Sequence, residues 1–421
     1  MNRRRQQHPD VVITGLGMVS PAGTDTATAW MAACAGLPTA APDARLAGMA
    51  VDFSCAVSAF DANAVLGTDA RRMDPFTQYA LAAAREAVAD AAADDGHWDP
   101  ARVGVLIGTA VGGLETWLEQ SARLGNTGPR AVNPLTAPKA IGNMAAATVA
   151  LDLGLHGPTL AVATACASGT TALGLALDLL RADRCDVVLA GGTDAAVTPL
   201  LSAAFDRLKA LSRRRDEPSS ASRPFDRHRD GFVLAEGAAV LVLERATDAR
   251  ARGRRPYATL LGYGESTDAH HLTSPDPDGK GARLAMRSAL ADAGVAASDV
   301  ALVNAHATGT PLGDAIEARL IHGFFGPHTA VTSTKGVTGH MLGAGGAAEA
   351  VFTALSVDQG VVPPTANFDE PGADIADIAD IADIADIDIV HGGPRSAPVP
   401  VAVSSSFGFG GHNAVVVLGR A

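Results

Sequence analysis

The sequence is poor in aromatic residues and carries no excess of positive charge. Aromatic residues make up 4% of its 421 residues, whereas glycine occurs 45 times, which favours closely packed small-residue helices and frequent turns. Lysine and arginine number 33 against 45 aspartates and glutamates, a formal net charge of −12. This balance argues against a nucleic-acid-binding surface, which needs a positive field. Disorder is excluded because 47% of the residues are hydrophobic and only 19% are charged.

Cysteines are few, and they are far apart in the sequence: Cys34, Cys55, Cys166 and Cys185. Without a CxxC pair they indicate neither a zinc site nor a disulfide framework, as is usual in a reducing compartment. No run of about 20 apolar residues is present, so we expect no membrane span. The basic start precedes an apolar run at 11–15 that is too short for a signal peptide. We expect a soluble, cytoplasmic protein.

Short apolar runs alternate with alanine-rich helical stretches along the whole chain. Runs that are apolar on both faces predict buried strands covered by helices. We expect five strands in the first half, at 11–17, 103–109, 160–166, 186–192 and 238–244. Five more follow, at 258–264, 301–306, 330–334, 399–405 and 413–419. Helices are expected between them, at 74–93, 139–153, 168–182, 282–293, 314–322 and 346–358. This order predicts a duplicated α/β protein with halves at 1–250 and 251–421.

Two conspicuous features carry no predicted function. An Ala-Asp-Ile repeat runs from 373 to 387, has no metal-ligand spacing, and is expected to be a surface insertion. Gly15 and Gly17 follow a predicted strand but lack the third glycine of a dinucleotide fingerprint, and no P-loop sequence occurs. We therefore assign these glycines to turns and close packing.

Cys166 differs from the other cysteines because a predicted strand ends and a predicted helix begins there. The positive end of a helix dipole and its unpaired N–H groups favour a thiolate at such a position. The same N–H groups can stabilise an oxyanion on an attached acyl group. Cys166 is therefore a candidate nucleophile, against the alternative of a small buried core residue.

Two histidines follow strands of the second half. His306 and His340 each lie in a loop rich in threonine and glycine, directly after a predicted strand or one short segment later. The carboxyl ends of strands are the edge at which α/β sheets build their sites. Zinc binding by both histidines and Cys166 is conceivable, but no HxxxH spacing supports it, so no metal is predicted.

The sequence resembles the β-ketoacyl-acyl-carrier-protein synthases in motifs that run in order through nearly the whole chain. The matching segments are 164–169, 223–237, 304–306, 333–340 and 406–411. Two histidines, rather than a histidine and an asparagine, are typical of the elongating branch, which includes type II polyketide ketosynthases. The resemblance implies the thiolase fold: two βαβαβαββ halves in a layered αβαβα body.

The resemblance also implies roles for individual residues. Cys166 would hold the growing acyl chain as a thioester, and His306 and His340 would stabilise the enolate formed when malonyl loses CO2. The N–H groups of Cys166 and Phe407 would form the oxyanion hole, and the Phe407 ring would gate the acyl pocket. A Lys335–Glu349 pair would lie beneath the site and orient it. The full expected catalytic set is Cys166, His306, His340, Lys335, Glu349 and Phe407.

Substrate and partner contacts are implied in the same way. Thr308 and Thr310 match positions that bind the pantetheine arm, and Val111 matches one that tunes chain length. The expected substrate-binding set is Thr308, Thr310, Thr273, Val111 and Phe409. An acidic acyl carrier protein would need a local basic patch, for which the candidates are Arg71, Arg72, Lys209, Arg213 and Arg214. Three positions depart from the usual pattern: Ala307 replaces a glycine, His412 a threonine, and Gly345 an alanine.

The predicted function is decarboxylative Claisen condensation in fatty acid or type II polyketide synthesis, with no cofactor beyond the carrier's phosphopantetheine. A homodimer, or a heterodimer with a chain-length-factor-like subunit, is expected because the family buries the strand at 160–166 against its mate. A chain-length factor itself would lack Cys166. A degradative thiolase would need a second catalytic cysteine where this chain has Ser404, Ser405 and Ser406.

Overall fold

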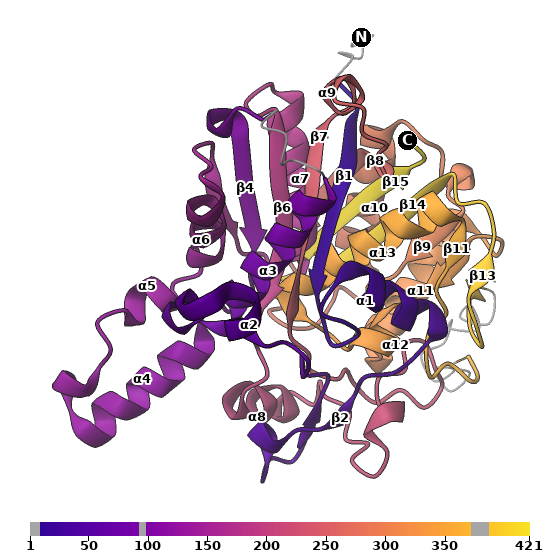
Figure 1. Cartoon of the computed structure of the whole chain (residues 1–421). Coiled ribbons are helices and arrows are strands. Elements are labelled where there is room, and N and C mark those ends of the chain that lie inside the picture. The colour runs from indigo at the N-terminus through magenta and orange to yellow at the C-terminus, as the bar shows by residue number, and fades with distance from the viewer. Residues whose placement is uncertain (1–8, 92–97, 372–386) are drawn as a thin grey trace.

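A computed structural model describes residues 9–91, 98–371 and 387–421. The Ala-Asp-Ile repeat lies almost wholly outside these residues, so its place in a surface loop stays a prediction. One mixed sheet of eleven strands runs through the described chain (Figure 1). Its strands, in spatial order, are β12 (Asp388–Ile389), β10 (Ala330–Thr332), β9 (Leu302–Asn304), β14 (Val401–Gly408), β15 (His412–Gly419), β8 (Ala258–Thr267), β1 (Val11–Val19), β7 (Gly237–Arg245), β6 (Val187–Asp194), β4 (Val103–Gly108) and β5 (Thr159–Val162).

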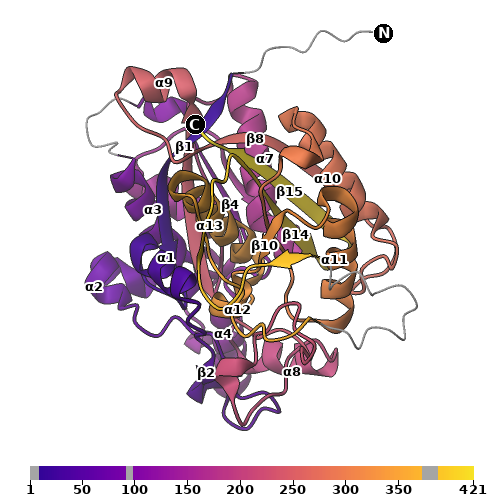
Figure 2. The same cartoon turned by 90° about the vertical axis from the view of Figure 1, so that its right-hand side faces the viewer.

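Helices cover this sheet in layers (Figure 2). The central layer contains α7 (Ser168–Arg181) and α13 (Gly345–Gln359), which contact each other and strands of both halves. The outer face of the first half carries α3 (Pro75–Asp90) and α6 (Met144–Leu153), and that of the second half carries α10 (Lys280–Ala293) and α11 (Pro311–Phe325). The predicted αβαβα layering is confirmed.

Glycines allow the buried helices to approach the strands closely. A Cβ on Gly108 of β4 would lie 2.4 Å from the carbonyl carbon of Ser168, at the start of α7. A Cβ on Gly169 would lie 2.8 Å from the backbone nitrogen of Ala347 in α13. A side chain at Gly108 would push α7 away from β4, and one at Gly169 would push α7 and α13 apart. The glycines in these elements therefore set the spacing at the site.

All ten predicted strands are present. Three of the four residues of β5, the strand after α6, are exposed in the single chain because it is the edge strand, so its expected burial against a mate stays a prediction. The helix expected at 139–153 is broken between α5 (Thr136–Ala140) and α6. Further elements were not predicted: α1 (Thr26–Ala35), α2 (Ala62–Leu66), α4 (Leu114–Thr127), α8 (Pro199–Arg207), α9 (Ala246–Ala251), α12 (Lys335–Thr338), β2 (Ala41–Pro42), β3 (Phe53–Ser54), β11 (Val361–Val362), β12 and β13 (Arg395–Ser396).

Parallel pairing brings the chain segments of the site to one edge of the sheet. β5 pairs in parallel with β4, and β9 pairs in parallel with both β10 and β14. Cys166 follows β5, His306 follows β9 and His340 follows β10, so all three leave the carboxyl ends of strands. Among the described residues, no helix is long and apolar enough to cross a membrane.

Candidate active site

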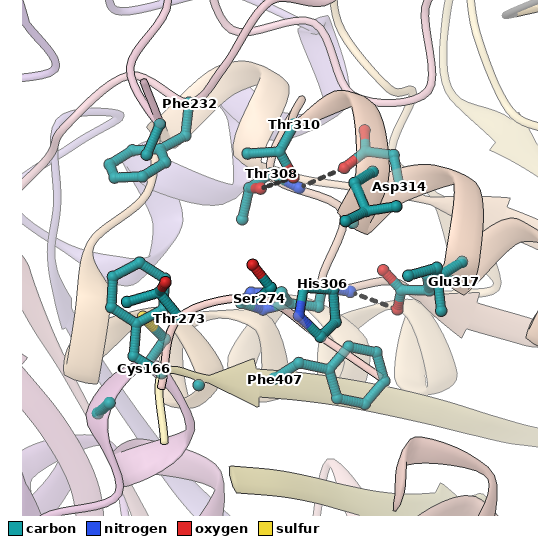
Figure 3. A pocket seen from close by; sticks show the side chains of 18 of the residues that line it. Cys166, Phe232, Thr273, Ser274, His306, Thr308, Thr310, Asp314, Glu317 and Phe407 are labelled. Atoms are coloured by element: carbon teal, nitrogen blue, oxygen red, sulfur yellow. Dashed lines mark hydrogen bonds between the residues drawn. The ribbon is translucent and has the colours of Figure 1, made fainter. Parts of the chain in front are cut away.

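Cys166, His306 and His340 line one cavity of about 520 Å³, whose lining comes from both halves of the chain. Figure 3 shows Cys166 and His306 in this cavity. The Nε2 atom of His340 lies 3.1 Å from the Cys166 sulfur. The two imidazole rings are 5.4 Å apart, centre to centre, and nearly perpendicular. A sulfur from the first half and two imidazoles from the second therefore share one site.

Cys166 lies in a tight turn between β5 and α7. This turn is the short 3-10 helix η6 (Ala165–Ala167), and Ala165 adopts the left-handed conformation with a φ of 50°. For a residue with a Cβ this conformation costs roughly 1–2 kcal/mol, so the turn is held by its surroundings. Ser168 contributes by donating its hydroxyl to the Ala165 carbonyl at 2.6 Å.

The N–H groups directed at the sulfur are those of Cys166 and Phe409. We expected Phe407 in place of Phe409, and the geometry corrects this. Phe407 is still part of β14, where its ring packs against His306 at 5.7 Å, centre to centre. Phe409 lies in the turn after β14, where its N–H is free to face the cavity. Its ring packs with Phe205 at 6.1 Å.

The resting charge of the cysteine also differs from expectation. Burial raises the pKa of the Cys166 thiol to about 12, and the nearby Asp194 carboxylate adds to this rise. The N–H groups and Lys335 act in the opposite direction but do not reverse it. Burial likewise lowers the pKa of His340 well below its usual value. Cys166 is thus a neutral thiol beside the neutral imidazole of His340, whereas its place at a helix N-terminus predicted a thiolate.

Backbone hydrogen bonds hold both histidines. The N–H of His340 donates to the Val233 carbonyl at 2.8 Å, and the His340 carbonyl accepts from Ala235 at 3.1 Å. His306 donates its N–H to the Glu317 carboxylate at 2.8 Å. Burial and the Lys335 charge lower the pKa of His306 well below its usual value. Both rings are therefore neutral and able to donate one N–H each.

Glu317 and Asp194 organise the site, and the sequence interpretation missed both. Glu317 on α11 also accepts hydrogen bonds from the Ala307 N–H and the Ser405 hydroxyl, and burial raises its pKa to about 7. Asp194 ends β6 and binds Thr109, Ala110, Val111 and Gly343. It thereby joins the loop at Val111 to the loop after His340. For Asp194 the available signal was an acidic residue at the end of a predicted strand. For Glu317 it was an acidic residue in the predicted helix that follows His306.

Lys335 and Glu349 form an ion pair beneath His340. Their side chains are 2% and 3% exposed, so neither charge is shared with solvent. Burial raises the pKa of Glu349 to about 7, although Lys335 opposes the rise. The expected pair is thus formed in the structure, at the start of α12 and within the first turns of α13.

Lys335→Met is expected to lower the free energy of unfolding by about 3–5 kcal/mol, because Glu349 would keep an unpaired buried charge. The loss should shrink as pH falls, since a protonated Glu349 no longer needs its partner. Urea unfolding of wild type and variant at pH 5 and pH 8 measures both effects. Lys280→Met is the control, because its pair with Asp278 is exposed and should contribute at most about 1 kcal/mol. Equal losses in the two variants would contradict the assignment.

The expected substrate residues line the cavity: Thr308, Thr310, Thr273, Val111 and Phe409. The Thr308 hydroxyl donates to that of Thr310 at 3.2 Å, and the loop is fixed where Thr308 donates its N–H to Asp314. Figure 3 shows both threonines on the wall of the cavity beside α11. The polar entrance and the apolar region around Phe205 and Phe232 suit a polar arm joined to an acyl chain.

The basic candidates do not form one uniform patch. Lys209 is exposed and lies on the cavity wall. Arg213 pairs with Asp206 at 2.8 Å, and Arg214 donates to the His228 carbonyl at 3.2 Å. Arg71 and Arg72 lie apart from the cavity lining, in the 3-10 helix η2 (Gly67–Arg72). Lys209 is therefore the candidate best placed beside the entrance.

The three departures from the family pattern have different surroundings. Ala307 is buried in the cavity wall. His412 does not line the cavity, and its ring lies over Gly410, where an added Cβ would be 3.2 Å from it. A Cβ on Gly345 would lie 3.9 Å from His340 and 3.7 Å from Glu349, directly beneath the site. Among the described residues, no group of three or more His, Cys, Asp or Glu side chains could hold a metal ion.

A partly buried cysteine at a helix N-terminus, with an imidazole at hydrogen-bond distance from its sulfur and two N–H donors beside it, defines an acyl-transfer enzyme that works through a covalent intermediate. The chain matches the beta-ketoacyl synthase N-terminal domain over residues 8–249 and the C-terminal domain over 257–369. The chain belongs to the β-ketoacyl synthase family, whose members are carbon–carbon bond-forming acyltransferases.

Relatives and solved structures agree with this membership. The chain is 41% identical to 3-oxoacyl-[acyl-carrier-protein] synthase 2 of Staphylococcus aureus (strain COL), over 98% of both chains. It is similar to the ishigamide ketosynthase/chain length factor structure, with a TM-score of 0.89, 32% identity, and 98% and 100% of the chains covered. A type II polyketide acyl-carrier protein in complex with its hexaketide-bound ketosynthase gives a TM-score of 0.89 at 29% identity, covering 99% and 100%.

Proposed function

We propose that this protein is an elongating β-ketoacyl-acyl-carrier-protein synthase that joins malonyl units to an acyl chain held on Cys166. The observation that carries the proposal is the 3.1 Å contact between Cys166 and His340 in a cavity shared with His306. The 41% identity to a 3-oxoacyl-[acyl-carrier-protein] synthase 2 supports the same substrates. The product would feed fatty acid or polyketide synthesis.

The first half-reaction transfers the acyl chain to the enzyme. The Cys166 thiol gives its proton to His340 as the sulfur attacks the thioester of an acyl carrier, because a neutral imidazole lies at hydrogen-bond distance. The N–H groups of Cys166 and Phe409 stabilise the negative oxygen of the tetrahedral intermediate. The pantetheine thiol leaves, and the acyl chain remains in the apolar part of the cavity.

The second half-reaction makes the new carbon–carbon bond. A malonyl thioester enters the cavity with its pantetheine arm beside Thr308 and Thr310, and loss of CO2 places negative charge on its thioester oxygen. One N–H from each of the two imidazoles, His306 and His340, stabilises this enolate where the charge develops. The enolate carbon then attacks the Cys166 thioester. No step changes an oxidation state, so the chemistry requires no redox cofactor.

The test is a condensation assay with malonyl- and acyl-carrier proteins of increasing chain length. We expect a β-ketoacyl-carrier product two carbons longer than the acyl substrate, together with one CO2. Free thiol exchange without CO2 release would contradict the proposal. The same series would report which acyl chains the cavity accepts.

The carrier protein would dock beside the cavity entrance, where Lys209 is exposed. Because carrier proteins are acidic, we expect Lys209→Glu to weaken carrier binding about tenfold at low salt, with the difference shrinking as salt rises. Titration of an acyl carrier at several salt concentrations measures this. Arg420→Glu, at the exposed C-terminus, makes the same charge change as a control. Equal affinities of the two variants would remove Lys209 from the docking surface; Arg71, Arg72, Arg213 and Arg214 would then be tested in turn.

A dimer is proposed on the exposed edge of the sheet. One edge of β5 pairs with no other strand in the described part of the chain, and Leu160 within it is 47% exposed. An exposed edge strand with an apolar side chain favours pairing with another chain. A second copy and a chain-length-factor-like subunit are the two candidates, and a ketosynthase/chain length factor pair among the similar structures supports the second.

A further inference from the structure

Two buried polar atoms, one on His340 and one on Glu349 beneath it, have no hydrogen-bond partner among the described residues. His340 Nδ1 and Glu349 Oε2 accept and donate no hydrogen bond there, although each residue is only 3% exposed. An unsatisfied buried polar atom costs free energy, so such atoms usually have a protein or water partner. A third group is therefore expected to join the two residues.

Gly345 provides the room for that group. It begins α13 in ordinary helical geometry, with a φ of −55° and a ψ of −51°, so its glycine is not required by the backbone. A Cβ there would meet only Glu349 Oε1 at 3.7 Å and His340 Nδ1 at 3.9 Å. The space that the usual alanine methyl would narrow thus adjoins His340 Nδ1 and the Glu349 carboxylate, whose second oxygen, Oε2, has no partner among the described residues. A site lined by such polar atoms suits one water molecule.

We propose that Gly345 seats one water molecule between His340 Nδ1 and the Glu349 carboxylate, and that this water passes a proton between them. The inference rests on the proposed function, in which His340 first accepts a proton at Nε2 and later donates one from Nε2. Burial disfavours the imidazolium form of His340. A proton gained at Nε2 is therefore balanced by release of the proton on Nδ1, which returns when Nε2 gives its proton back. Water serves both directions because it donates and accepts.

The protons balance over the cycle. In the first half-reaction, the Cys166 proton moves to His340 Nε2 and the Nδ1 proton moves through the water to Glu349, while the departing pantetheine thiolate takes a proton from solvent. In the second, Nε2 returns its proton to the released Cys166 thiolate, and Glu349 returns its proton to Nδ1. One proton is consumed and one CO2 released per turnover. The raised pKa of Glu349, about 7, suits a group that changes protonation near neutrality.

Three variants test this inference. Gly345→Ala fills the water's place with a methyl group, and Gly345→Ser replaces the water by a hydroxyl that donates and accepts. Gly323→Ala is the control, because Gly323 is an exposed position of α11 where an added Cβ meets nothing within 4 Å. Nitrogen-15 NMR of the resting protein should find the His340 proton on Nδ1 in wild type, Gly345→Ser and Gly323→Ala, and on Nε2 in Gly345→Ala. This measurement needs no substrate.

Measuring the two half-reactions separately distinguishes a loss of proton transfer from damage to the fold. Acylation of Cys166 should slow about 10²-fold in Gly345→Ala, the contribution of a general base, and recover in Gly345→Ser. Release of CO2 from malonyl carrier, measured with Cys166→Gln also present, should change less than twofold. The inference is overturned if Gly345→Ala keeps the wild-type tautomer or acylation rate, or if Gly345→Ser behaves like Gly345→Ala. Failure of wild type to acylate would overturn the proposed function instead, and the NMR result would stand independently.

Discussion

Cys166→Ala is expected to lower the rate of condensation by at least about 10⁴-fold, because removal of a covalent nucleophile leaves no site for the acyl chain. None of the other cysteines can replace it: Cys55 and Cys185 are buried, and Cys34 does not line the cavity. Formation of β-ketoacyl-carrier, followed by mass spectrometry, measures the loss. Cys34→Ala should keep the full rate.

Cys166→Gln should separate the two halves of the reaction. Its amide carbonyl resembles the acylated cysteine and leaves both imidazoles in place, so CO2 should still be released from malonyl carrier while condensation is lost. Loss of both activities in protein with an unchanged melting temperature would contradict the division between Cys166 and the histidines. It would indicate that decarboxylation itself needs the sulfur.

His306→Ala is expected to lower decarboxylation about 10²–10³-fold, the value of one donor to a developing oxyanion. Acylation of Cys166 should change only slightly, because it is His340 that contacts the sulfur, at 3.1 Å. His340→Ala should therefore impair both half-reactions. CO2 release and the rate of acyl loading, measured separately for each variant, give the comparison.

If His306→Ala slowed acyl loading as strongly as His340→Ala, the two rings would share the role of base, and the assignment of this role to His340 would be wrong. Glu317→Gln offers a further comparison, since Glu317 holds His306 through the backbone and does not touch the reacting atoms. It should slow decarboxylation less than His306→Ala does.

Local sequence patterns predicted a duplicated α/β chain and the residues at the ends of its strands, and the family resemblance implied the layers. The apolar runs predicted all ten strands because buried strands must be apolar on both faces. β5 lies at the edge of the sheet, and its composition does not tell whether a second chain covers it. Cys166, His306 and His340 were identified by position after strands, and the structure places them in one cavity.

Features that depend on three-dimensional contacts were not predicted. The neutral thiol of Cys166 results from burial among groups distant in sequence, which outweighs the helix N-terminus. Which of Phe407 and Phe409 directs its N–H at the Cys166 sulfur depends on where β14 ends, and composition does not determine that boundary. Asp194 binds segments more than 80 residues away and looked like the end of an ordinary strand.

Intact-mass analysis of the protein incubated with an acyl carrier tests the central claim most directly. The account predicts a mass increase equal to one acyl group, mapped by proteolysis to Cys166 and discharged when malonyl carrier is added. An acyl group on another residue, or a Cys166 thioester that malonyl carrier leaves untouched, would contradict it.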